Sequence, residues 1–88
     1  MTTYEISPMD GRASFYGKAR VFCDDNGTET LFSYETAVMQ KESDGTLIRL
    51  WDGWSYTTGR HIWSFCALRK KELDKMETGK RYKRSDLT

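Results

Sequence analysis

The residues best suited to chemistry are Arg60 and His61, which follow a run of small hydroxyl residues. They fall in the first turn of an expected helix, where free backbone amides and an arginine favour an anion such as phosphate or carboxylate. In the competing, structural interpretation, Thr57 or Thr58 caps the helix. Arg60 then pairs with Asp52, and His61 packs against the edge of a sheet. We favour the structural interpretation because capping residues occur at nearly every helix.

The single histidine has no catalytic set around it. A histidine near hydroxyl groups can act as a base, but the sequence has no sharp nucleophile turn and no second carboxylate pair. Gly17 and Gly59 are isolated and form no phosphate-binding loop. Cys23 and Cys66 lack the spacing of zinc ligands, and we expect two buried free thiols. The sequence therefore predicts no enzymatic activity, no metal site and no cofactor.

Large rings surround Arg60 in the sequence. Two precede the expected helix, and a third lies off its buried stripe at 100° per residue. Rings and arginine are enriched at protein-binding hot spots. In the alternative interpretation these rings close the open end of a small core, as a short chain needs. The predicted partner-binding residues are Trp54, Tyr56, Arg60, His61 and Trp63.

The net charge of +1 hides a basic C-terminus. Residues 69–88 carry eight basic and four acidic groups, which leaves the rest of the chain at −3. Such an end can bind phosphates while a ring stacks on bases. A basic segment also has a structural use, because cations after a helix interact favourably with the negative end of the helix dipole. The charge of −3 on the rest of the chain argues against a broad DNA-binding face. The candidate nucleic-acid-binding residues are Lys80, Arg81, Tyr82, Lys83 and Arg84.

A chain of 88 residues with 38% hydrophobic content forms one small globular domain. It contains no signal-peptide pattern and no apolar run long enough to span a bilayer. We therefore expect a cytoplasmic protein of a bacterial cell with no membrane partner. Its oligomeric state is left open.

Two hairpin signals organise the first half of the chain. Asn26-Gly27 separates two alternating segments, and a two-residue loop there pairs Val21 with Phe32. That register leaves Leu31 on the polar face. Asp44-Gly45 predicts a second hairpin, whose register requires either a partly covered polar face or a bulge near residues 42–43. Before these hairpins, residues 4–6 suggest a short edge strand and residues 7–11 a turn.

After Asp52-Gly53 the hydrophobic period changes from two to 3.6. One amphipathic helix is expected over residues 59–78, with Arg69 as the single break in its apolar stripe. The fold class is therefore α+β: an antiparallel three- to four-stranded β-meander with one long C-terminal amphipathic helix packed on one face. Residues 1–79 form the domain, and residues 80–88 form a basic, flexible tail.

Three segments carry a resemblance to known sequences. They read Ser14-Phe15-Tyr16-Gly17-Lys18-Ala19, then Ser33-Tyr34-x-Thr36, then Ser55-x-Thr57-Thr58-x-Arg60-His61-Ile62-x-x-Phe65. Together they resemble a group of small uncharacterised proteins encoded by bacteriophages and mobile elements of gut bacteria. The resemblance covers about residues 14–66. It implies a small phage-type accessory protein, and it implies no reaction.

Two functional hypotheses follow. In the first, a phage or mobile-element protein binds a host protein or ribonucleoprotein complex and modulates or inhibits it, with a CRISPR-type defence component as one such target. In the second, the basic C-terminal tail binds nucleic acid. An affinity capture from the host with and without nuclease separates the two.

Overall fold

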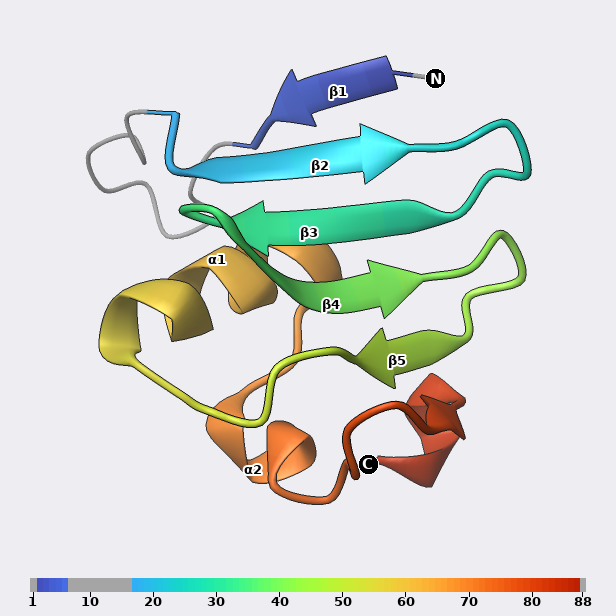
Figure 1. Ribbon diagram of the computed structural model, residues 1–88. Coiled ribbons are helices and arrows are strands. Elements are labelled where there is room, and N and C mark those ends of the chain that lie inside the picture. Colours follow the sequence, from blue (N-terminus) through green and yellow to red (C-terminus); the bar gives the residue numbers. More distant parts are fainter. Residues whose placement is uncertain (1, 7–16, 88) are drawn as a thin grey trace.

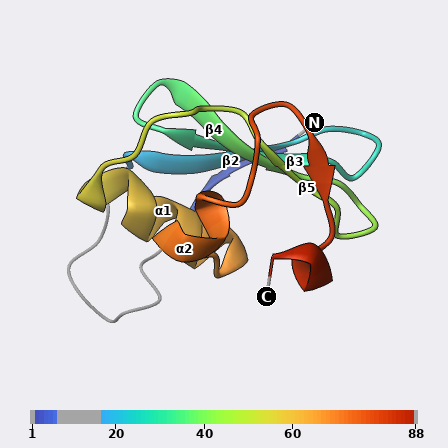
Figure 2. The same ribbon diagram turned by 90° about the horizontal axis from the view of Figure 1, so that it is seen from below.

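A computed structural model describes residues 2–6 and 17–87 of the chain. The turn expected over residues 7–11 lies outside the described residues. The described part is an α+β fold in which six antiparallel strands follow one another in chain order (Figure 1). Both α-helices lie on one face of this sheet (Figure 2). The strands are β1 (Thr2–Glu5), β2 (Ala19–Cys23), β3 (Glu29–Ser33), β4 (Thr36–Lys41), β5 (Leu47–Arg49) and β6 (Arg81–Tyr82).

The α+β class and the meander are confirmed, whereas the predicted number of strands is too low. One additional strand is β6, which follows the helices and pairs with β5. The expected short edge strand is β1, which pairs with β2. Neither strand is longer than four residues, and so neither has a strong alternating pattern of its own.

The first hairpin uses a three-residue loop. The amide of Asp24 donates to the carbonyl of Thr28 at 3.0 Å, and the amide of Gly27 donates back to Asp24 at 3.2 Å. The Asp24 carboxylate accepts from the amides of Asn26 and Thr28 at 2.8 and 3.0 Å. Gly27 has φ +82, the left-handed position that a three-residue hairpin loop requires. The predicted two-residue loop is therefore wrong.

This loop moves the register of β2 and β3 by one residue. Val21 pairs with Leu31, and both are fully buried. Phe32 pairs instead with Arg20 on the face of the sheet that the helices do not cover. The expected register placed the apolar Leu31 on the polar face of the sheet. A shift of one residue moves every side chain of β3 to the other face, so Leu31 now lies on the apolar face.

The second hairpin has the same kind of loop, and it settles the register of β5. The amide of Glu42 donates to Thr46 at 2.8 Å, and the amide of Gly45 donates back to Glu42 at 2.9 Å. Gln40 consequently pairs with Ile48. A bulge near residues 42–43 was one of the two alternatives for this hairpin. The bulge in the structure lies instead at Val38, which is the unpaired residue between the two registers of β3 and β4.

The predicted long helix is wrong. The structure has α1 (Tyr56–Cys66) and a short α2 (Lys70–Leu73). Ala67 ends α1 in the left-handed conformation, with φ 58. This break places Leu68 in the core at 1% exposure and leaves Arg69 exposed. A continuous helix would have placed a cation on the buried stripe, and the break avoids that cost.

The start of α1 also differs from the expectation. Ser55 is the N-cap, and its hydroxyl accepts from the amide of Thr58 at 3.1 Å. Thr57 and Thr58 lie inside the first turn. Thr58 is instead buried at 5% exposure and faces the sheet.

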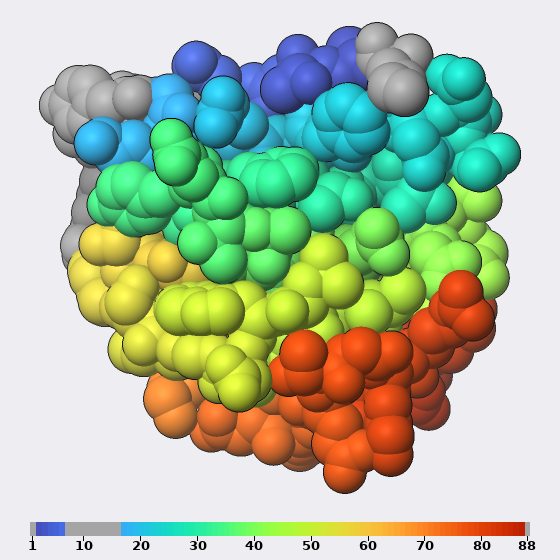
Figure 3. All heavy atoms as spheres, viewed as in Figure 1, coloured from blue at the N-terminus to red at the C-terminus, as the bar shows by residue number. Residues whose placement is uncertain are grey.

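The C-terminal residues, expected as a tail, pack on the sheet and the core. Tyr82 of β6 pairs with Leu47 of β5. A 3-10 helix, η1 (Arg84–Asp86), follows, and Leu87 behind it is 1% exposed within the core cluster. Figure 3 shows this segment at the opposite end of the molecule from β1. Leu87 is an apolar residue after a basic segment, and its burial explains why this segment packs on the core. Removing the Leu87 side chain from water lowers the free energy of the folded protein.

Candidate partner-binding groove

Helix α1 has a second face made of large side chains. Its buried face carries Thr58, His61, Ile62, Phe65 and Cys66, which contact the sheet and the core. Tyr56, Arg60 and Trp63 are spaced at i, i+4 and i+7, so they share a different face of the helix. Tyr56 is 60% exposed, whereas a surface helix usually presents short polar or charged groups to water.

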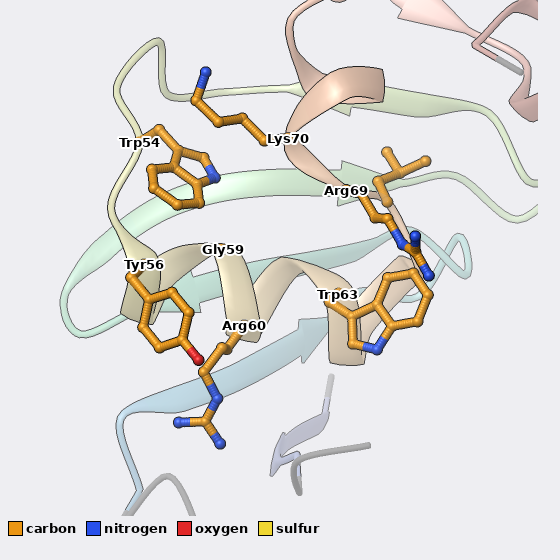
Figure 4. A pocket seen from close by; sticks show the side chains of 8 residues that line it. Trp54, Tyr56, Gly59, Arg60, Trp63, Arg69 and Lys70 are labelled. Atoms are coloured by element: carbon orange, nitrogen blue, oxygen red, sulfur yellow. The ribbon is translucent and has the colours of Figure 1, made fainter. Parts of the chain in front are cut away.

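These residues line a groove of about 240 Å³ between α1, the loop before it and the start of α2 (Figure 4). Four of the five predicted partner-binding residues are brought together here, and His61 is not among them. Arg69 and Lys70 enter the groove because Ala67 turns the chain back after α1. The groove is lined by Trp54, Tyr56, Gly59, Arg60, Trp63, Leu68, Arg69 and Lys70.

The Trp54 ring packs directly against Gly59. A Cβ atom at Gly59 would lie 2.9 Å from both Cζ2 and Nε1 of the Trp54 indole. The ring therefore occupies the space that any side chain at this position would need. Trp54 remains 41% exposed on its solvent side. The sequence pattern predicts Gly59 as the start of a helix, and no local pattern indicates its contact with a ring five residues earlier.

Two cations lie over rings in the groove. The guanidinium carbon of Arg69 is 5.1 Å from the centre of the Trp63 ring, and the ammonium of Lys70 is 5.9 Å from that of Trp54. Such contacts hold a cation in place while its remaining donors face the solvent. Lys70 also pairs with Asp74 one turn later, at 3.2 Å. None of the lining side chains is acidic, so the groove is cationic as well as aromatic.

His61 is buried at 1% exposure on the opposite side of α1. Its Nδ1 atom lies 2.7 Å from Oγ of Ser33, and that hydroxyl lies 2.8 Å from Oγ1 of Thr58. Burial lowers the pKa of His61, and the nearby charge of Arg60 lowers it further. The ring of Tyr34 lies beside it, with centroids 5.9 Å apart. This cluster fixes α1 to the end of β3.

Sequence reasoning missed Ser33. It belongs to a strand that precedes His61 by 28 residues, and no local pattern connects the two. Hydroxyl groups of Ser33, Thr36, Ser55 and Thr58 line a second hollow of about 300 Å³ together with Trp51 and other residues. Ser33 already contacts His61 and Thr58 there, as a buried hydroxyl needs.

The candidate nucleic-acid-binding residues lie at β6 and η1, away from the groove (Figures 1 and 2). Their charged groups have partners within the chain. Arg81 bonds to Glu42 at 2.7 Å, Lys83 pairs with Asp44 at 3.1 Å, and Lys80 pairs with Glu77. The remaining two also have contacts: Tyr82 accepts from the amide of Glu77 at 2.8 Å, and Arg84 donates to the carbonyl of Cys66.

Comparison with known sequences adds a family to this geometry. Residues 4–84 match the model of DUF8033, a family of unknown function. The chain belongs to this family. The match of the DUF8033 protein covers every residue of the groove as well as β6, so both features lie inside the region that defines the family. No curated protein and no solved structure matches the chain.

Over residues 2–6 and 17–87 of the DUF8033 chain, no three His, Cys, Asp or Glu side chains are grouped as metal ligands would be. No helix of the described part has the length and apolar character needed to cross a bilayer.

Proposed function

We propose that this DUF8033 protein is a small accessory protein of a phage or mobile element that binds a host macromolecule and modulates or inhibits it. The contact is the groove on α1. A host protein or ribonucleoprotein complex is the partner, and a CRISPR-type defence component is one such target. The resemblance over residues 14–19, 33–36 and 55–65 supports the phage or mobile-element origin.

The single observation that carries this proposal is the exposed set of rings on α1 and before it. Trp54 and Tyr56 are 41% and 60% exposed, and together with Trp63 they surround a groove rather than close a core. Large apolar rings left in contact with water raise the free energy of the free protein, and a partner that covers them recovers it. Trp, Tyr and Arg are also the residues that dominate binding energy at interfaces.

The test is an affinity capture from a lysate of the bacterial host, treated with nuclease, with the intact chain and two ring variants. Tyr56→Ala removes a ring of the groove that is 60% exposed, and Tyr34→Ala removes a ring outside it that is 46% exposed. We expect the partner to be retained by Tyr34→Ala and lost with Tyr56→Ala. Circular dichroism and thermal unfolding first establish that both variants are folded. A partner lost equally with both variants, or with neither, contradicts the proposal.

A further variant removes no side chain of the groove and changes the position of one. Gly59→Ala forces the Trp54 ring to move, because the new Cβ would lie 2.9 Å from it. Alanine is also the better helix former by about 1 kcal/mol, so this change does not weaken α1. We expect Gly59→Ala to lower the yield of captured partner without lowering the midpoint of thermal unfolding.

The alternative, nucleic-acid binding through the C-terminal residues, has less support. Lys80, Arg81 and Lys83 are each paired with a carboxylate, and phosphate contacts would have to compete with those pairs. Deletion of residues 80–88 would remove β6 and Leu87 and is no clean test. Substitution of Lys80 and Lys83 by Gln removes charge and keeps the strand. If nucleic acid is the partner, this variant loses about one unit of log–log salt slope for each phosphate contact removed.

A further inference from the structure

We infer that the groove takes an acidic peptide segment of a protein partner, with an apolar side chain between the rings and carboxylates on the surrounding cations. This inference rests on the proposed function and names the chemistry of the partner.

The charge of the helical layer favours an anionic partner. The groove presents Arg60, Arg69 and Lys70, and it has no acidic lining residue. Between residues 54 and 74 the sequence holds one further cation, Lys71, and two carboxylates, those of Glu72 and Asp74. Oε2 of Glu72 is buried, and Asp74 pairs with Lys70 at 3.2 Å. Four cations against two carboxylates leave the helical layer with an excess of positive charge for a negative segment to meet.

The positions of the cations favour carboxylates over stacked bases. Single-stranded nucleic acid gains much of its affinity by stacking bases on free ring faces. The guanidinium of Arg69 lies over the Trp63 ring, and Trp54 has Gly59 against it with the Lys70 ammonium 5.9 Å from its centre. These contacts reduce the free ring face, whereas the outward donors of the cations can still bond a carboxylate.

The size of the groove limits what enters it. A volume of about 240 Å³ lies below the range of about 300–1,000 Å³ that is typical of small-molecule sites. It suits a few side chains of an extended segment. Leu68 lies beneath the groove at 1% exposure, and the accessible apolar surface comes from the rings of Trp54 and Tyr56, which are 41% and 60% exposed. An apolar side chain of the partner can therefore be buried there while its acidic neighbours remain at the rim.

The inference is tested with three defined probes. The first is a short fluorescent peptide that alternates Glu and Leu, the second has Gln in place of each Glu, and the third is an oligothymidylate. Fluorescence anisotropy measures affinity, and the indole N–H signals of Trp54 and Trp63 in NMR spectra locate the contact. We expect the Glu-Leu peptide to bind, to shift both indole signals, and to weaken as salt is added. We expect the Gln-Leu peptide to bind about tenfold more weakly, since it lacks the charge-assisted bonds.

A matched pair of variants distinguishes groove charge from net charge. Arg69→Gln removes a cation that lines the groove, and Lys71→Gln removes one that does not. Both residues are exposed, so neither change threatens the core. We expect Arg69→Gln to lower the affinity for the Glu-Leu peptide about fivefold to tenfold, as the loss of one charged hydrogen bond does. We expect Lys71→Gln to change that affinity little.

Three results overturn the inference. One is equal binding of the Glu-Leu and Gln-Leu peptides. Another is an oligothymidylate that binds more tightly than the Glu-Leu peptide and shifts both indole signals. The third is no binding of the Glu-Leu peptide while a nuclease-resistant host partner still requires Tyr56, in which case the proposed function stands. If the Glu-Leu peptide binds as expected but no host partner depends on Tyr56, the inferred chemistry is supported and the proposed host-binding function is wrong.

Discussion

Oγ of Ser33 and Nδ1 of His61 lie 2.7 Å apart at the buried junction of β3 and α1. Both side chains are at most 2% exposed, and Thr58 extends the contact to a third buried polar group. The junction holds the N-terminal half of α1 on the sheet, and the rings of the groove project from the same turns of that helix. The position of the candidate site therefore depends on a hydrogen-bonded cluster that contributes no residue to it.

We predict that Ser33→Ala destabilises the fold by about 1–3 kcal/mol. The substitution removes the hydroxyl between two buried polar groups, and the loss of a buried hydrogen-bond partner costs roughly that amount. Urea unfolding followed by circular dichroism measures the change. Thr36→Ala, at an exposed position three residues later, serves as the control and should cost less than about 0.5 kcal/mol. Equal costs for the two variants would show that the cluster does not stabilise the junction.

We predict that the protein loses stability as pH falls below about 6.5, the ordinary pKa of histidine. Burial lowers the pKa of His61 in the folded protein, so the unfolded chain binds a proton first, and acid favours unfolding. For one such group, the free energy of unfolding changes by at most about 1.4 kcal/mol per pH unit.

The measurement is the free energy of unfolding at several pH values between 7.5 and 5.5, a range in which an unperturbed histidine is the side chain that titrates. The chain has one histidine, so His61→Gln removes this contribution. The variant is expected to be less stable at neutral pH and to show a flatter dependence on pH. An unchanged slope in His61→Gln would assign the effect to another group.

We predict that Ala67→Gly stabilises the protein by about 0.5 kcal/mol. Ala67 ends α1 with φ 58, a conformation that costs an L-residue about 1–2 kcal/mol and costs glycine little. The gain exceeds the additional freedom that glycine gives to the unfolded chain. If residues 59–78 formed one continuous helix, the same change would destabilise it by about 1 kcal/mol. The sign of the change in thermal unfolding therefore decides between the two geometries.

We predict that Cys66 is alkylated more slowly than Cys23 in the native protein. Cys66 is 4% exposed, and burial raises the pKa of its thiol to about 11. Cys23 is half-buried, and its pKa is raised by burial and by the adjacent Glu29. Only the thiolate reacts, and the pKa is raised at both thiols, so the lower exposure of Cys66 is the reason to expect its slower reaction. Mass spectrometry after timed labelling gives the two rates, with the urea-unfolded chain as the reference. Faster labelling of Cys66 would contradict its placement.

Much of the local structure could be predicted from the sequence. Asn26-Gly27 and Asp44-Gly45 predict hairpin turns because glycine reaches positive φ without strain, and both turns are present. The α+β class follows from the change of hydrophobic period after residue 53. The loop length was not determined by these dipeptides. The Asp24 carboxylate favours a three-residue loop by accepting two amides, and the register of β2 and β3 follows from that loop.

The candidate site was predicted in part. Trp54, Tyr56, Arg60 and Trp63 are close in sequence, and the spacing of a helix is enough to bring most of them together. Arg69 and Lys70 could not be assigned to the same site, because a continuous helix would have carried them away from it. His61 is close to the rings in sequence but lies on the buried side of α1, as the structural interpretation of this segment expects. Closeness in sequence does not show which face of a helix is buried.

By itself the sequence determined the turns, the fold class and the amphipathic character of the helical region. These properties arise from the conformational preferences of a few neighbouring residues, and so they can be recognised along the chain. Tertiary structure alone decided the strand register, the end of α1 at Ala67, the meeting of Ser33 with His61 and the position of Leu87 in the core. Each of these depends on burying apolar groups and pairing polar ones between segments far apart in sequence, and that free energy is not encoded in any single local pattern.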